Sequence, residues 1–233
     1  MAPADHAEEA RIRLAYARRH TDPRYSWFSR GHLLFMQERE RHVLAALKRE
    51  GLSSLESQSI LEIGCGTGYW LREFVKWGGL PEHITGVDLL PDKVATARQL
   101  CPEQMTILCG NATQLALPDE AFDVVFQSTV FTSMLDADMK RQVASEMRRL
   151  VKRDGVILWY DFFADNPWNA DVRGVRKREI HHLFPDCRVE LRRITLAPPL
   201  LRLLAPYSWL ACYVLGRIPW LCTHYLGVIR RRP

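Results

Sequence analysis

Short apolar runs alternate with amphipathic runs through the middle of the chain, and this alternation constrains the fold more than any other feature. The apolar runs have the length of strands, and the amphipathic runs have the periodicity of helices. The expected elements are, in chain order, strand 59–63, helix 68–77, strand 83–87, helix 91–100, strand 105–109, strand 122–127, helix 138–151 and strand 155–162. Strands that alternate with helices build a mostly parallel sheet with helices on both faces. The sequence therefore predicts a doubly wound α/β fold.

The segments on either side of this core extend the prediction. A polar arm over residues 1–30 leads into an amphipathic helix over residues 31–50, so we expect an N-terminal helical arm. Beyond the core, "CRVELRRITL" predicts a sixth strand and "THYLGVIRR" a seventh. The apolar segment 198–220 between these two strands is expected to be a helical insertion.

Composition sets broader limits. With 233 residues, 47% of them hydrophobic, the chain is of a size for one domain with its own core. The formal charge of +5 favours weak attraction to anionic surfaces, but the basic residues are scattered, so a nucleic-acid partner is not expected. The N-terminus lacks the apolar stretch of a signal peptide, and the six cysteines include no C-x-x-C pair. We therefore expect a cytoplasmic protein with no zinc site and no disulfide framework.

The stretch "ILEIGCGTGYWL", residues 60–71, places Gly64, Gly66 and Gly68 at alternate positions between an expected strand and an expected helix. Glycine lets the backbone adopt positive φ and come close to a ligand, because it has no Cβ. A dinucleotide site has the spacing G-x-G-x-x-G, whereas here the position of the third glycine holds Tyr69. The spacing therefore argues against a pyrophosphate site.

Polar side chains close the next strands. Asp88 ends the second expected strand, twenty residues after Gly68, where a carboxylate can accept hydrogen bonds from both hydroxyls of a ribose. Asn111 and the backbone after it end the third strand, where they can meet the edge of an adenine, with Leu89 and Ala112 against its faces. Together with the glycine stretch, these residues predict a nucleoside ligand.

The ordered motifs "LEIGCGTG", "GVDLLPDKVATAR", "GNATQLALPDEAFDVVFQS" and "MRRLVKRDGVILWYDF" cover roughly residues 58–162. Through them the chain resembles the class I S-adenosylmethionine-dependent methyltransferases. The resemblance implies a Rossmann-like sheet of seven strands, with the last strand antiparallel between the fifth and the sixth. It also implies a single methyltransferase domain over 1–233, with an arm and helix (1–50), a cofactor-binding core (58–162) and an acceptor-side segment (163–233).

Carried over by position, the resemblance implies S-adenosyl-L-methionine as cofactor and S-adenosyl-L-homocysteine as product. We expect no metal in the site. Glu62 is expected to order the glycine turn and the methionine amine, and Asp88 to hold the ribose. The turn from Gly64 to Gly68, with Cys65 and Gly66, is expected to pass under the methionine part of the cofactor. Leu89, Asn111 and Ala112 are expected to face the adenine, and Gln127 to lie near the sulfonium. Tyr25 is expected to cover the site.

Several of these residues have a plain structural alternative. Glu62 could merely cap the glycine turn, and Asn111 is a common turn residue. Gln127 has no feature that separates a role in the site from a role in packing. Cys65 is a small residue of the turn, to which we assign no chemistry.

The acceptor decides which catalytic residues are needed. An alcohol needs a general base, and Tyr160 and Asp161, at the end of the fifth expected strand, are the candidates. His181 and His182 lie farther along, on an expected surface helix where histidines are usually solvated. The chain has "QSTVF" after its fourth strand, in place of the Asn-Pro-Pro-Tyr-like motif of many adenine and glutamine N-methyltransferases. Hydroxyl, carboxyl, amine and carbon acceptors stay open.

Two segments could cover the acceptor. Tyr25 and Trp27 suit a lid, or they could pack on the sheet. The insertion 198–220 could be a lid, which we favour, a dimer surface, a membrane-contacting patch with Arg202 and Arg217 toward lipid phosphates, or ordinary core. Its uncharged part is too short to span a bilayer.

The sequence thus predicts a methyltransferase that acts on a small-molecule or lipid-linked acceptor, with oxygen as the favoured accepting atom. It predicts a monomer or homodimer and leaves peripheral membrane contact open. The alternatives are an RNA methyltransferase, an N- or C-methyltransferase, a nicotinamide oxidoreductase, and a non-catalytic cofactor-binding partner.

Overall fold

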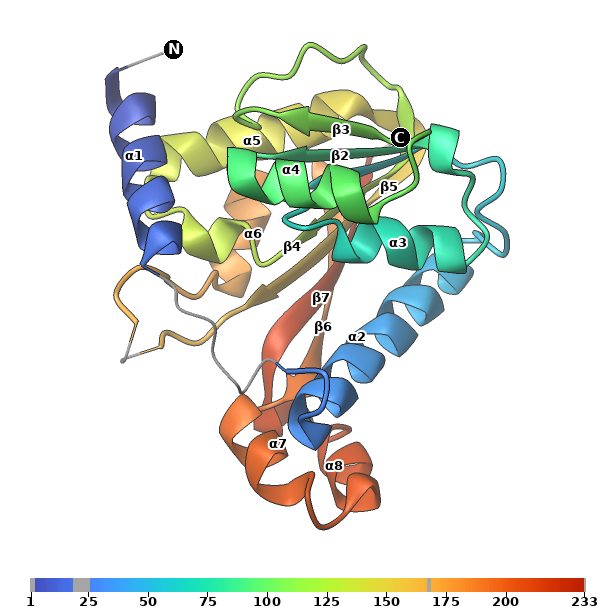
Figure 1. Ribbon diagram of the computed structural model, residues 1–233, viewed down its shortest axis with the longest axis vertical. Helices are drawn as coiled ribbons and strands as arrows, with labels where there is room; N and C mark the ends of the chain where they lie inside the picture. The colour runs from blue at the N-terminus through green and yellow to red at the C-terminus, as the bar shows by residue number, and fades with distance from the viewer. Residues whose placement is uncertain (1–2, 19–25, 167–168, 233) are drawn as a thin grey trace.

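A computed structural model describes residues 3–18, 26–166 and 169–232. Its centre is a seven-stranded sheet in the order β3-β2-β1-β4-β5-β7-β6 (Figure 1). The strands are β1 (Ile60–Ile63), β2 (Ile84–Asp88), β3 (Thr106–Cys109), β4 (Phe122–Ser128), β5 (Val151–Phe162), β6 (Cys187–Leu196) and β7 (Cys222–Arg231).

The first five strands are parallel, and β7 runs antiparallel to both of its neighbours, β5 and β6. The order reverses beside β1, with β2 on one side and β4 on the other. In such a sheet the carboxyl ends of the strands flank a crevice at the point of reversal, where ligands bind. The expected doubly wound sheet with an antiparallel last strand is confirmed.

Helices cover both faces of the sheet (Figure 1). One face carries α2 (Arg30–Arg49), α3 (Tyr69–Lys76) and α4 (Pro91–Leu100), whose buried apolar side chains form one core cluster with the sheet. The other face carries α5 (Ala137–Leu150) and α6 (Lys177–Leu183), and α1 (Pro3–Ala17) contributes Ile12 to the same cluster. Successive residues of a strand face opposite clusters, because side chains alternate across a sheet.

The insertion before β7 is helical, as expected. It forms α7 (Pro198–Leu204) and α8 (Trp209–Leu215), followed by the 3₁₀ turn η4 (Pro219–Leu221). Its few buried residues pack against Leu34 and Phe35 near the start of α2, in a small core separate from the other two. In Figure 1 this pair of helices projects from the body of the protein, below the sheet. Two further 3₁₀ turns are η2 (Pro81–His83) and η3 (Phe131–Ser133).

The start of β5 differs from the expected boundary. The sequence predicts a strand that starts at residue 155, but β5 begins at Val151, directly after α5. The pairing with β4 shifts register between Phe122 and Val124. A Cβ on Gly155 would lie 2.8 Å from the Val151 side chain and 2.9 Å from the Asp123 carbonyl oxygen. This glycine therefore permits a close approach inside a strand, and it does not end a helix.

Candidate active site

The glycine turn begins where β1 ends, and main-chain hydrogen bonds fasten it to β2. The amides of Gly64 and Cys65 donate to the Val87 carbonyl oxygen at 2.7 and 3.0 Å. Gly64 has φ +71°, and a Cβ there would lie 2.3 Å from a Val130 methyl carbon. Gly66 has φ +54°, but a Cβ there would meet no atom within 4 Å. Packing against Val130 thus requires a glycine at position 64, whereas Gly66 leaves its main chain facing open space.

Asp88 joins this turn to the end of β2. Its Oδ2 accepts from the Gly66 amide at 2.7 Å, and its Oδ1 accepts from the Leu90 amide at 2.9 Å. Burial raises the pKa of Asp88, and these two hydrogen bonds oppose the shift. A carboxylate oxygen accepts two hydrogen bonds, so each oxygen keeps capacity for one ribose hydroxyl.

Glu62 lies beneath the turn and is almost fully buried. Its Oε2 atom has no hydrogen-bond partner among the described residues. Burial raises the pKa of Glu62 well above its usual range, the charge of Asp88 adds to the shift, and Arg39 opposes it. A buried carboxyl oxygen without a partner is costly, so this atom is suited to a donor that a ligand brings.

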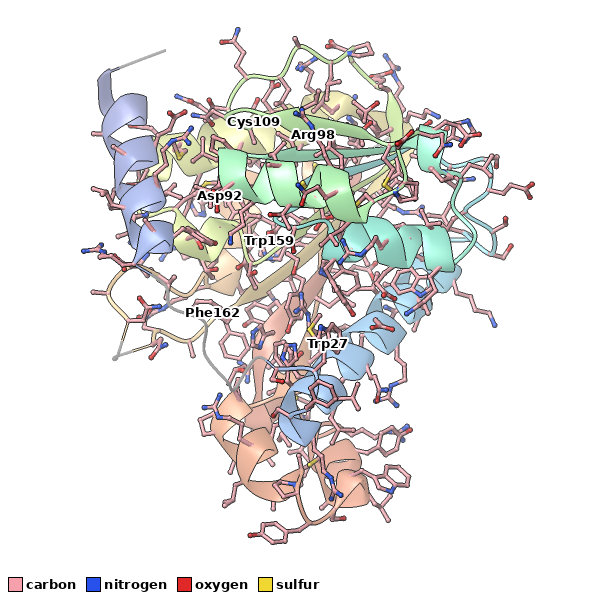
Figure 2. The ribbon with its side chains drawn as sticks, viewed as in Figure 1. Trp27, Asp92, Arg98, Cys109, Trp159 and Phe162 are labelled. Atoms are coloured by element: carbon pink, nitrogen blue, oxygen red, sulfur yellow. The ribbon has the colours of Figure 1, made fainter. Side chains whose placement is uncertain are left out.

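A cavity of about 270 Å³ opens beside these groups, at the carboxyl ends of β1, β2 and β4. In Figure 2, Asp92 at the start of α4 and Cys109 at the end of β3 lie at the same end of the sheet. Among the expected residues, those that line the cavity are Gly64, Gly66, Asp88, Leu89, Asn111 and Ala112. Cys65 is buried away from it, beside Gly86.

Part of the cavity wall is formed by α1, which the sequence did not assign to the site. Ile12 and Tyr16 of α1 line the cavity, and Glu9 accepts a hydrogen bond from Asn111 Nδ2 at 2.7 Å. Asn111 Oδ1 in turn accepts from the Thr113 amide at 2.9 Å, which is a turn interaction. The apolar spacing of Ile12 and Tyr16 in "EEARIRLAYA" was the available signal for this helix.

The sequence and fold have known counterparts. Residues 60–155 match a family described as "Methyltransferase domain". A malonyl-[acyl-carrier protein] O-methyltransferase of Serratia marcescens is 34% identical over 107 residues, which are 46% of this chain and 39% of that one. A 2-methyl-6-phytyl-1,4-hydroquinone methyltransferase of Synechocystis is 31% identical over 131 residues, which are 55% of this chain and 40% of that one. The chain therefore spans about two fifths of the length of these relatives.

Among solved structures, a 1,6-didemethyltoxoflavin-N1-methyltransferase of Burkholderia thailandensis, with bound S-adenosylhomocysteine, has a TM-score of 0.62 at 18% identity. The alignment covers 100% of this chain and 91% of that one. An S-adenosylmethionine-dependent methyltransferase of Clostridium acetobutylicum has a TM-score of 0.64 at 11% identity, with coverage of 90% and 96%. Residues 60–155 therefore match a methyltransferase domain, and the chain has the fold of S-adenosylmethionine-dependent methyltransferases. The expected resemblance and the expected fold are confirmed, and the bare turn at Gly66, the Asp88 carboxylate and the unpartnered Glu62 oxygen fit S-adenosylmethionine, the cofactor that the resemblance implies.

Gln127 of β4 is fully buried. Its Oε1 accepts from the Val130 amide at 3.2 Å, and a side-chain hydrogen bond from Gln127 favours the charged form of Asp161. Gln127 does not line the cavity. It therefore shapes the segment where β4 ends and the following loop begins, and there Ser128 and Thr129 line the cavity.

The side chains of Tyr160 and Asp161 lie on opposite faces of the sheet, because the two residues are consecutive in β5. Asp161 Oδ1 accepts from Thr132 Oγ1 at 2.7 Å, whereas the Tyr160 hydroxyl lies 3.0 Å from Thr195 Oγ1. Burial raises the pKa of Asp161 to about 7, and it also raises the pKa of Tyr160. Both side chains are buried, and neither lines the cavity, so their catalytic role stays a prediction.

The other residues that the sequence suggested for the acceptor side do not lie together in the structure. Tyr25 lies outside the described residues. Trp27 is half exposed and stacks on Tyr69 with ring centroids 5.7 Å apart. His181 and His182 are exposed on α6, where His182 Nδ1 contacts the Arg178 carbonyl oxygen, so the structure places them as solvated residues.

Proposed function

We propose that the protein is a methyltransferase that transfers the methyl group of S-adenosylmethionine to a small-molecule acceptor, and that the accepting atom is oxygen. The observation that carries this proposal is the convergence of the open main chain at Gly66 with the Asp88 carboxylate at the wall of one cavity. Bare main chain can lie against the cofactor, and the carboxylate can hold its ribose.

When bound, this cofactor supplies a methyl group that is already electrophilic, because it is attached to a positively charged sulfur. The protein's main task is then alignment and exclusion of water, which can be worth an effective molarity of about 10⁵ to 10⁸ M. Asp88 would fix the ribose and Glu62 the amine end. Ile12 and Tyr16 of α1 would cover the adenosine part from solvent.

The acceptor class is supported by two further observations. The relatives include proteins named for phytyl-hydroquinone, demethylmenaquinone and sterol methylation, as well as the malonyl-carrier O-methyltransferases. The helices α7 and α8 expose large apolar side chains, although no described helix is long and apolar enough to cross a membrane. We therefore extend the proposal to an acceptor with apolar or lipid-linked bulk, met by a protein that contacts the membrane peripherally.

The roles assigned to single residues and to segments are part of the proposal. Tyr160 and Asp161 are the candidates for the acceptor side, and the chain acts as one methyltransferase unit over its 233 residues. If the acceptor is an alcohol, a base there would contribute about 10²- to 10⁴-fold to the rate.

The direct test is transfer of an isotope-labelled methyl group from S-adenosylmethionine to components of a cell extract, separated by polarity and identified by mass spectrometry. We expect the label in a small or lipid-extractable molecule, bound through oxygen. Label in RNA would instead support a nucleic-acid acceptor. If the protein binds S-adenosylhomocysteine but labels nothing, it is a cofactor-binding partner without turnover.

A further inference from the structure

The cavity is bounded on one side by segment 128–134, which leads from the end of β4 into η3. Most residues of this segment line the cavity, namely Ser128, Thr129, Val130, Ser133 and Met134. A Cβ at Gly64 would lie 2.3 Å from a methyl carbon of Val130, so the segment also packs directly on the glycine turn. The space left for a ligand between this turn and the end of β4 therefore depends on the conformation of segment 128–134.

Thr129 has a backbone conformation that its side chain disfavours. Its φ is +60°, in the left-handed region that β-branched residues rarely adopt. Such a conformation persists where the surrounding structure over-determines it. The Thr129 amide donates to the Tyr160 carbonyl oxygen at 2.7 Å, and the Thr129 carbonyl oxygen accepts from Ser133 Oγ at 3.4 Å. Contacts from β5 and from η3 thus hold Thr129 at the cavity wall.

Thr132, in the middle of η3, is fully buried and does not line the cavity. Its Oγ1 lies 2.7 Å from Asp161 Oδ1 and 3.3 Å from the Thr129 carbonyl oxygen. A hydroxyl group has a single proton to donate, and the closer carboxyl oxygen is the stronger acceptor. The Thr132 carbonyl oxygen accepts from the Arg173 amide at 2.9 Å. The hydroxyl and the carbonyl group of Thr132 are therefore both engaged, and the hydroxyl is held by β5.

Asp161 is itself held by the sheet, because β5 pairs with β4 on one side and with β7 on the other. Its carboxyl group accepts hydrogen bonds from the hydroxyl and the main chain of Thr132 and from the side chain of Gln127. Gln127 directly precedes segment 128–134, and Thr132 lies within it. The hydrogen bonds that the described residues make to this carboxyl group therefore all come from the end of β4 and from η3.

We propose that Asp161 and Thr132 form a positioning pair, which holds segment 128–134 in the conformation that receives the cofactor. Neither residue touches the ligand, and the pair acts through Thr129 and Val130, which line the cavity. The inference rests on the proposed function, because it takes the cavity as the site of S-adenosylmethionine. As a base, Asp161 would have to contact the acceptor, whereas a positioning residue works without such a contact.

Calorimetric binding of S-adenosylhomocysteine to the full-length protein tests the pair. Asp161→Ala and Thr132→Val each remove one partner of the hydrogen bond, and we expect each to weaken binding about 3- to 30-fold. The double variant should bind no more weakly than the weaker single variant, because two residues that act through one interaction are not additive. Thr132→Ser keeps the hydroxyl and should bind within about twofold of the wild type.

Thr96→Val is the matched control, because it removes a hydroxyl that donates to the Asp92 carbonyl oxygen within α4, and it should bind like the wild type. The unfolding transition of each variant shows whether it is folded. If Asp161→Ala does not fold, Thr132→Val and its rescue by Thr132→Ser carry the test.

The inference is overturned if folded Thr132→Val or Asp161→Ala binds S-adenosylhomocysteine like the wild type, which indicates a purely structural role. It is also overturned if the two losses add in the double variant. Normal binding by Asp161→Ala with loss of labelled methyl transfer to the extract would make Asp161 a base instead. If the wild type does not bind S-adenosylhomocysteine, the proposed function is refuted and the inference with it, whereas binding that neither variant weakens refutes the inference alone.

Discussion

Asp88 makes the sharpest prediction at the scale of single residues. Asp88→Asn removes one of two carboxylate acceptors, so the variant loses either a main-chain bond to Gly66 or Leu90 or a bond to the ribose. Hydrogen bonds to charged groups are worth about 1.5 to 3 kcal/mol, and we therefore expect S-adenosylhomocysteine to bind about 10- to 150-fold more weakly. Isothermal titration calorimetry measures this. Asp92→Asn, an exposed carboxylate in the first turn of α4, is the control, and equal affinity of the two variants would refute the ribose assignment.

Asp161 makes a prediction about pH and stability. Burial raises its pKa to about 7, so between pH 4 and 7 the folded protein holds a proton that the unfolded chain has released. This contribution to stability is therefore complete below pH 4 and is lost as the pH rises through 7. With about 1.4 kcal/mol for each pKa unit, the loss between pH 5 and 8 is on the order of 3 kcal/mol.

The measurement is the free energy of unfolding from denaturant titrations at pH 5 and pH 8. Asp161→Asn lacks the titrating group, so its stability should fall less over this interval than that of the wild type. Glu62 and Asp88 also have raised pKa values, so the free energy of unfolding still depends on pH in both proteins. Equal slopes in the two proteins would show that Asp161 does not titrate in this range.

The sequence predicted the site residues that belong to the glycine motif or end a neighbouring strand. It did not predict the residues that distant helices place near the site. Asp88 follows from its place at the end of a strand, and the open space at Gly66 follows from the glycine spacing. The helical pattern of the sequence places Arg39 among the charged residues of the outer face. The neighbouring residues in the sequence do not indicate that Tyr160 and Trp70 enclose its guanidinium. Its burial is decided by tertiary packing alone.

At the scale of elements, the projecting pair α7 and α8 leads to a prediction about membranes. Tyr207, Trp209 and Trp220 are 85%, 65% and 87% exposed, and no acidic residue follows Glu190 in the sequence, although arginines do. Aromatic side chains favour the interface of a bilayer, and arginines favour anionic lipid headgroups. We expect the protein to sediment with vesicles that contain phosphatidylglycerol, and more weakly with pure phosphatidylcholine.

Replacing Trp209 and Trp220 by serine should weaken this partitioning at least about fivefold, because burying one large apolar side chain is worth about 1.5 to 3 kcal/mol. Leu100→Ser, an exposed apolar residue of α4, is the control. Unchanged sedimentation of the double variant would contradict membrane contact through these helices. Elution of the wild type as a dimer that the double variant cannot form would assign the surface to a second copy of the chain.

Most elements followed from the sequence, because their signals are local. Helix α4 covers the predicted residues 91–100, and β6 is the predicted "CRVELRRITL". The start of β5 did not follow, since a glycine that allows close approach in a strand looks like a glycine that ends a helix. The position of α1 over the cavity was equally hidden, because it depends on contacts with segments more than 100 residues away, such as that between Glu9 and Asn111.

At the scale of the whole molecule, the cavity lies where elements from the first half of the sheet meet α1 and the loop after β4. A ligand there would contact parts of the chain that are otherwise connected only through the sheet. Binding to the folded state alone stabilises it by RT ln(1 + [L]/Kd), which is about 2.7 kcal/mol at a hundredfold excess over Kd. For a chain of this size, 1 kcal/mol corresponds to about 2 to 4 °C in melting temperature.

S-adenosylhomocysteine at a hundredfold excess over its Kd should therefore raise the melting temperature by about 5 to 10 °C, as measured by differential scanning calorimetry. NADH at the same concentration should leave it unchanged, because the third glycine of a pyrophosphate-binding turn is replaced by Tyr69, whose hydroxyl is engaged by Glu40. A shift with NADH and none with S-adenosylhomocysteine would assign the cavity to a nicotinamide cofactor. At the same concentration the stabilisation should fall to about 0.3 to 1.4 kcal/mol in Asp88→Asn, because binding is expected to be about 10- to 150-fold weaker, and this ties the global effect to the carboxylate that holds the glycine turn.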